Sequence, residues 1–185
     1  MIKCIIGHFI NLDMAILKRN RLFCNKIWQA TRFLFLLLEQ NSPGTCLNDS
    51  SLLKDPGNLL LLNQWIMSNL HAMVHKVNSG MSRYDFHHAT EALYNFLYGQ
   101  LCDVFVEAIK PLTGKDQQES ILVLALCLDV ALRCMVPFMP FLSEELYQRL
   151  HRKLGDDGVE SQPSTSILIA EFPEKDEVPF CLELF

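Results

Sequence analysis

The apolar residues of this chain recur every three or four positions over most of its length, which is the period of an amphipathic helix. Five helical stretches are predicted, at about residues 13–40, 59–77, 85–109, 119–135 and 143–150. The stretch 119–135 is apolar on nearly all sides, so we expect it at the centre of a bundle. Residues 167–172 have the apolar character of a strand. The expected fold class is therefore all-α, a bundle of four to five helices with a small C-terminal strand or hairpin.

Residues that favour turns separate these stretches. Asn41-Ser42-Pro43-Gly44 begins a polar loop that runs to about residue 57, and Asn78-Ser79-Gly80 predicts the end of the second helix. Pro111 predicts the end of the third, because proline lacks the N–H that a helix interior needs. Ser143, followed by two glutamates, is expected to cap the fifth helix, since its hydroxyl can accept from free N–H groups of the first turn.

Length and composition agree with one folded domain. The chain has 185 residues, of which 50% are hydrophobic and 20% charged. No apolar run reaches the roughly 18 residues that a membrane-spanning helix needs, so no membrane partner is expected. The seven cysteines form no Cys-x-x-Cys pair and lie mostly in apolar helical patterns. We therefore expect reduced thiols and a cytoplasmic protein, with a mitochondrial compartment left open.

The sequence lacks the patterns of catalytic and metal sites. It contains no glycine-rich phosphate loop and no Gly-x-Ser-x-Gly motif. His71 and His75, four residues apart on a predicted helix, could share a metal ion, but no glutamate follows His71 and no third ligand is near. Cys102, beside Asp103, is interpreted as a core thiol rather than a nucleophile. We expect no catalytic residue, no metal site and no cofactor in this chain.

Charge is distributed unevenly along the chain. Residues 1–40 carry six Lys and Arg against two acidic residues, a net charge of +4, and the remaining residues carry −9. Within the first helix, five polar or basic residues recur at spacings of three or four, opposite an apolar stripe that includes Phe23 and Ile27. We call these five residues the basic stripe: Lys18, Arg21, Asn25, Gln29 and Arg32. Arg19 and Lys26 flank the stripe, and Trp28 and Phe33 lie at its edges.

This combination of side chains suits unpaired RNA. Cations can hold phosphates, the amides of Asn and Gln can bond to base edges, and aromatic or guanidinium planes can stack on base faces. The alternative is a solvated basic face whose aromatic residues turn toward the core. The spacing alone leaves both interpretations open.

A family resemblance begins in the same helix. Residues 25–33, Asn-Lys-Ile-Trp-Gln-Ala-Thr-Arg-Phe, resemble the N-K-[LI]-W-N-A-x-R-F signature of the α-helical anticodon-binding domain of valyl-tRNA synthetase, a class I aminoacyl-tRNA ligase. Residues 101–111 are similar to its [FL]-C-D-x-[YF]-x-E-x-x-K-P block, which points to valine among related enzymes. Further similar blocks follow the chain order at residues 63–70, 84–86, 93–96, 137–150 and 167–173.

The resemblance implies a domain that holds the anticodon stem and loop of a valine-accepting tRNA while the acceptor end reaches a distant catalytic domain. It divides the chain into an atypical N-terminal segment 1–12, a helical anticodon-binding domain 13–155, and a loop, short strand and tail 156–185. Trp28 is expected to pack rather than to stack on RNA. The implied RNA contacts are Asn25, Lys26, Gln29, Arg32 and Phe33, with Lys18, Arg19 and Arg21 as auxiliary phosphate contacts.

The sequence also departs from the family pattern. The HIGH and KMSKS motifs, with which class I synthetases handle ATP, are missing from this sequence. ATP is therefore implied only for a catalytic domain that this chain lacks. We expect the chain to be a piece of a larger ligase and to be inactive alone. Asn63 and Gln64 stand where the family has Asp and Arg, Val136 where it has His, and Tyr147 where it usually has Trp. These departures leave an alternative: a helical protein-interaction module with little RNA binding, which docks on a synthetase or another partner through its acidic face.

Overall fold

The structure, a computed structural model, describes residues 14–40, 59–154 and 166–174, which form an all-α bundle. The predicted fold class is confirmed. The N-terminal segment 1–12, the polar loop 41–57 and most of the tail 156–185 lie outside the described residues. Among the described helices, none is both long enough and apolar enough to cross a membrane. The elements, in chain order, are α1 (Met14–Gln40), α2 (Leu61–Ser82), α3 (Phe86–Tyr94), the π-helix η2 (Asn95–Phe105), α4 (Val106–Ile109), α5 (Lys115–Met135) and α6 (Pro140–Leu154).

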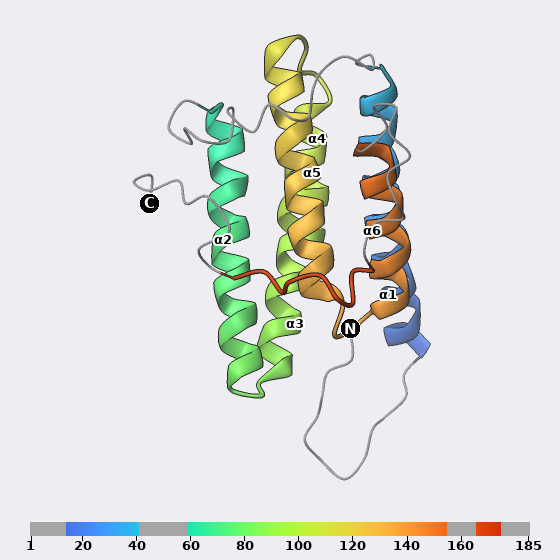
Figure 1. Cartoon of the computed structure of the whole chain (residues 1–185), viewed down its shortest axis with the longest axis vertical. Helices are drawn as coiled ribbons and strands as arrows, with labels where there is room; N and C mark the ends of the chain where they lie inside the picture. The colour runs from blue at the N-terminus through green and yellow to red at the C-terminus, as the bar shows by residue number, and fades with distance from the viewer. Residues whose placement is uncertain (1–13, 41–58, 155–165, 175–185) are drawn as a thin grey trace.

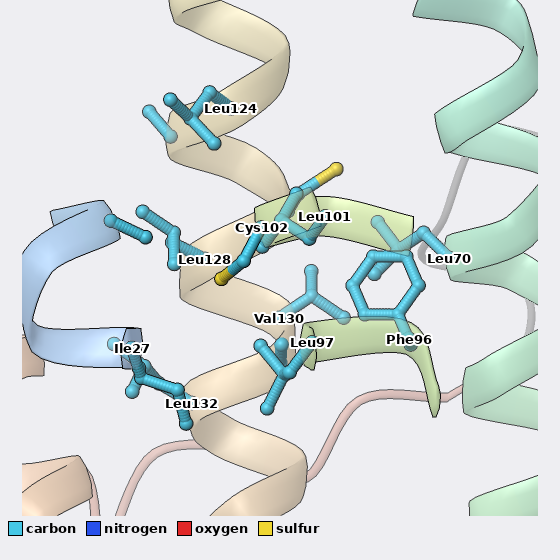
Figure 2. Packing of buried hydrophobic residues seen from close by; sticks show 14 of the residues in the cluster. Ile27, Leu70, Phe96, Leu97, Leu101, Cys102, Leu124, Leu128, Val130 and Leu132 are labelled. Atoms are coloured by element: carbon cyan, nitrogen blue, oxygen red, sulfur yellow. The ribbon is translucent and has the colours of Figure 1, made fainter. Parts of the chain in front are cut away.

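The central helix is α5. More than half of its residues are buried, and it contacts α1, α2, α3, α4 and α6. Figure 1 shows it in the middle of the bundle, with α2 on one side and α1 and α6 on the other. Figure 2 shows side chains from α1, α2, η2 and α5 converging on one core; among them Ile27, Leu70, Leu97 and Leu128 are at most 1% exposed. The central position predicted for this apolar segment is confirmed.

The third predicted helix is interrupted by the π-helix η2, which the sequence pattern did not indicate. In η2 and the start of α4 the buried residues come in adjacent pairs that recur after five and then four positions: Phe96 with Leu97, Leu101 with Cys102, and Phe105 with Val106. This spacing fits the i→i+5 hydrogen bonding of a π-helix better than a period of 3.6. Val104, which the shorter period predicts as buried, is 46% exposed.

Gly80 does not end the second helix, and that prediction is wrong. Helix α2 continues to Ser82, and Gly80 is buried where the chain turns back into α3. A Cβ on Gly80 would lie 3.0 Å from the Cβ and backbone N of Ala89 and from the backbone O of Asp85. The glycine is therefore required by the close approach of α2 and α3 rather than by a helix stop.

Ser143 does not cap α6, which is a second correction. The helix begins at Pro140, and the backbone N–H of Ser143 already donates to the backbone O of Met139 at 3.1 Å. Proline suits the first position because its missing N–H would have no helical partner there. The Ser143 side chain is instead fully buried, and its Oγ has no hydrogen-bond partner among the described residues.

The predicted strand at 167–172 is not formed, which is a third correction. Residues 167–169 form a turn, with the N–H of Ile169 donating to the O of Ser166 at 3.0 Å. Because the described structure offers no strand to pair with, the backbone of this segment bonds to side chains of the helices that it crosses in Figure 1. The three bonds run from the N–H of Ile167 to Glu144 Oε2 (3.0 Å), from Arg133 Nη1 to the O of Glu171 (3.2 Å) and from Asn78 Nδ2 to the O of Pro173 (3.0 Å).

Two glycine substitutions test the account of the α2–α3 contact. Gly80→Ala should lower the free energy of unfolding by about 1–3 kcal/mol, because two of the three atoms in its way belong to the backbone. Gly99→Ala is the matched control: its Cβ would meet nothing within 4 Å, and it should be neutral or stabilising by up to about 1 kcal/mol. Urea unfolding followed by circular dichroism measures both, and equal effects of the two variants would contradict the account.

Candidate nucleic-acid interface

The basic stripe forms the exposed face of α1. Phe23, Ile27 and Leu34 on the opposite face are at most 3% exposed and belong to the core. All five members of the stripe are exposed, and so is Arg19. The exposure of the stripe follows from the helical period, which places residues spaced by three or four positions on one side of the helix.

Most of the positive charge on this face is not neutralised within the described structure. Lys18, Arg19, Arg21 and Arg32 form no ion pair with any described residue. The acidic residue of α1, Glu39, lies at its C-terminal end and is paired with Lys153 of α6 at 2.8 Å. Lys18, Arg21 and Arg32 are thus available to an anionic ligand from one side of α1, and Arg19 lies about 100° around the helix from Lys18.

Lys26 differs from these cations because it is paired with an acidic residue of the protein. Its ammonium pairs with the Asp103 carboxylate and lies 3.4 Å from the centre of the Tyr98 ring. Burial alone would lower the pKa of Lys26, but the hydrogen bond and charge of Asp103 outweigh it, so the pKa lies above its ordinary value. A phosphate would have to compete with Asp103 for this ammonium, and its role as an RNA contact stays a prediction.

A stack of aromatic rings supports Lys26. The rings of Phe23 and Tyr94 lie 5.2 Å apart, as do those of Tyr94 and Tyr98, and both pairs are stacked. The stack runs from the core of the bundle to Lys26 and holds the edge of α1 against η2. Sequence reasoning missed Tyr94, Tyr98 and Asp103 as part of this edge, because the interaction joins residues far apart in the chain.

The two aromatic residues at the edges of the stripe also have partners in the protein. Phe33 is half-buried, with the Lys110 ammonium 5.9 Å from the centre of its ring. Trp28 is half-buried on the other edge, where the Arg149 guanidinium of α6 lies 4.9 Å from its ring centre. The expected packing role of Trp28 agrees with this contact. Sequence reasoning also missed Arg149, whose i,i+4 spacing from Glu145 is that of an ordinary surface pair on a helix.

The remaining candidates from the sequence do not form a reactive site. Cys102 is buried, and burial is the main reason that its pKa is raised to about 11. The nearby Lys26 opposes this rise and Asp103 adds to it, so Cys102 is a protonated thiol at neutral pH. On α2, His71 is buried and His75 is exposed. Within residues 14–40, 59–154 and 166–174, no three His, Cys, Asp or Glu side chains are gathered as metal ligands would be.

Comparison with known proteins identifies the family. A family model described as the anticodon-binding domain of tRNA ligase matches residues 63–184. The chain belongs to this family. It is 39% identical over 175 residues to valine–tRNA ligase of Homo sapiens, an alignment that covers 92% of this chain and 13% of that protein. It is 34% identical over 172 residues to valine–tRNA ligase of Fervidobacterium nodosum, with 92% of this chain and 18% of that protein covered.

A relative named "Probable valine--tRNA ligase, mitochondrial", from Dictyostelium discoideum, is 36% identical over 186 residues and covers 90% of this chain. The chain thus spans 13–18% of the length of these curated relatives. Helix α1 precedes the region that the family model matches. The alignments to these two ligases cover 92% of this chain, and the residues outside them are too few to include all 27 residues of α1. At least part of α1 is therefore matched in the ligases.

The raised pKa of Cys102 predicts low thiol reactivity in this anticodon-binding domain. At about pH 8 only about one Cys102 in a thousand is a thiolate, so iodoacetamide should modify the half-buried Cys24 well before Cys102. Mass spectrometry of peptides after timed alkylation measures the order. Unfolding in guanidinium should abolish the difference, and equal rates in the folded protein would show that Cys102 is not buried as described.

Proposed function

We propose that this domain binds the anticodon stem and loop of a valine-accepting tRNA, as part of a valine–tRNA ligase, through the exposed face of α1. The observation that carries the proposal is the row of cations on that face with no partner among the described residues. Lys18, Arg19 and Arg21 would hold phosphates, while Asn25 and Gln29 would reach base edges. The relatives, which are valine–tRNA ligases, support the choice of tRNA.

The length of the face suits a segment of RNA backbone. From Lys18 to Arg32 the helix rises by about 21 Å, at about 1.5 Å per residue. The cations lie at both ends of this distance and the two amides lie between them. Such a row can hold phosphates on either side of a few nucleotides whose bases are unpaired, which is the kind of RNA that proteins read by sequence.

The separation of charge along the chain explains how an acidic protein can bind a polyanion. The formal net charge of −5 combines +4 in residues 1–40 with −9 elsewhere. Salt largely screens the interaction between exposed charges that are further apart than a Debye length, about 8 Å at physiological salt. The approaching RNA therefore experiences the local field of α1 rather than the net charge.

No catalytic step is assigned to the residues of this chain. Activation of valine with ATP would belong to the catalytic domain of a full-length ligase, with this domain positioning the tRNA. We propose the cytoplasm as its compartment, because its cysteines suit a reducing environment. The mitochondrion is the alternative, since one relative is named as a mitochondrial ligase.

A second candidate is a protein-interaction module. Large apolar side chains are exposed near one end of α6: Phe141 is 90% exposed, Leu168 64% and Ile169 73%. Glu144, one turn after Phe141, binds the backbone of Ile167 and so brings these side chains to the same end of the bundle. Such side chains suit a protein contact, although they lie on different elements from the basic stripe.

Removing two cations from the stripe tests the proposed function. Arg21→Ala with Arg32→Ala should weaken binding of a valine anticodon stem-loop by roughly 5- to 30-fold, about 0.5–1 kcal/mol for each exposed contact. The slope of log affinity against log salt should also flatten by roughly 1–2, because two phosphate contacts are lost. Fluorescence anisotropy across a salt series measures both quantities.

The control removes the same charge elsewhere, with Lys76→Ala and Lys115→Ala on α2 and α5, and should change neither quantity much. Lys26→Ala with Arg32→Ala should also weaken binding, with the smaller share from Lys26, because Asp103 already neutralises its ammonium. Affinity and slope that stay unchanged in the stripe variants would overturn the proposed function. Equal binding of valine and non-cognate stem-loops would favour the interaction module.

A further inference from the structure

A pocket of about 310 Å³ opens between α1 and α6 at the edge of the basic stripe. Six residues line it: Trp28, Thr31, Arg32 and Phe35 from α1, and Leu146 and Arg149 from α6. None of the predicted RNA contacts except Arg32 belongs to it. The volume lies at the lower end of the range for small-molecule sites, about 300–1,000 Å³, so it suits one ring system rather than a larger ligand.

The inner part of the pocket offers mostly apolar surface. Thr31 and Leu146 are at most 1% exposed, and the Thr31 hydroxyl already donates to the backbone O of Ile27 at 3.1 Å. Trp28 and Phe35, both half-buried, add aromatic surface. A flat, weakly polar ring is the kind of group that such surfaces favour.

The mouth of the pocket carries two guanidinium groups with different surroundings. Nε and Nη2 of Arg149 both contact Glu145 Oε1, at 2.6 and 2.5 Å, and this pairing holds the guanidinium over the Trp28 ring. A guanidinium held in this way offers a flat face for stacking rather than a free charge. Arg32 has no hydrogen-bond or ion-pair partner among the described residues, and its charge is available to an anion.

From these features we infer that the pocket holds one unstacked nucleobase of the bound RNA, with an adjoining phosphate on Arg32. The inference rests on the proposed function and adds to it a specific site for one base. Arg32 belongs both to the pocket and to the basic stripe, so a backbone that follows the stripe passes the mouth of the pocket. That continuity favours a base of a polynucleotide over a free nucleotide. Aromatic and guanidinium surfaces stack on any base, so the stacking itself is independent of base identity.

The test measures whether the effect of removing one loop base depends on the residues of the pocket. A valine anticodon stem-loop is prepared intact and with one loop nucleotide at a time made abasic, and its affinity is measured by anisotropy for the original protein and for Arg149→Gln. One abasic position should weaken binding to the original protein about tenfold, but binding to Arg149→Gln by less than about twofold. Phe35→Leu, which keeps an apolar side chain in the wall, should reduce the effect at the same position.

The matched control is Arg152→Gln, which removes an exposed cation of α6 that does not line the pocket. It should keep the full tenfold effect, and circular dichroism confirms that each variant is folded. Suppose that the intact stem-loop binds, but every abasic position weakens binding to both pocket variants as much as to the original protein. The pocket is then not a base site, and the proposed function survives. If the intact stem-loop does not bind the original protein, both are overturned.

Discussion

The burial of α5 on nearly all sides is the constraint on which the rest of the bundle depends. Its apolar surface must be covered, and α1, α2, α3, α4 and α6 each contact it. A helix that covers a central neighbour can bury only one stripe of its own, so its opposite face is left for solvent. On α1 that remaining face is the basic stripe. The candidate interface therefore follows from core packing and needs no loop to position it, which keeps its side chains on a rigid element.

The cations around α1 divide into two groups by their surroundings. Lys26, Arg149 and Lys153 have acidic partners, Asp103, Glu145 and Glu39, and the Lys26 and Lys153 pairs join α1 to η2 and α6. Ion pairs as exposed as these contribute little stability. The Lys26 and Lys153 pairs and the Arg149–Trp28 contact lie along the edges of α1, where they favour one orientation of that helix. The cations of the exposed face have no such partners among the described residues. Position on the helix, rather than residue type, thus separates side chains that orient α1 from side chains available to a ligand.

The helical period predicted what depends on one helix alone. It gave the face of α1 and the central place of α5, because each follows from which side of a single helix is apolar. Two of the three wrong predictions concern contacts between elements, and the third, at Ser143, concerns where α6 begins. The closeness of Gly80 to Ala89 is set by how α2 meets α3, and residues 167–172 have no strand beside them among the described residues. Neither fact can be predicted from the period of a single helix. The pocket was missed for the same reason, since Arg32 and Arg149 become neighbours only after folding.

The altered position Asn63 bears on the choice between RNA binding and a protein-interaction module. It is fully buried: its Nδ2 donates to Glu119 Oε1 at 2.6 Å, and its Oδ1 accepts from the Ser120 hydroxyl at 3.1 Å. An aspartate here, as in the family pattern, would set a second carboxylate against Glu119 and could not donate to it. The asparagine is thus explained by its contact with α5. Because no part of it reaches the surface, it creates no new docking face and does not disturb α1, so this departure gives no support to the loss of RNA binding.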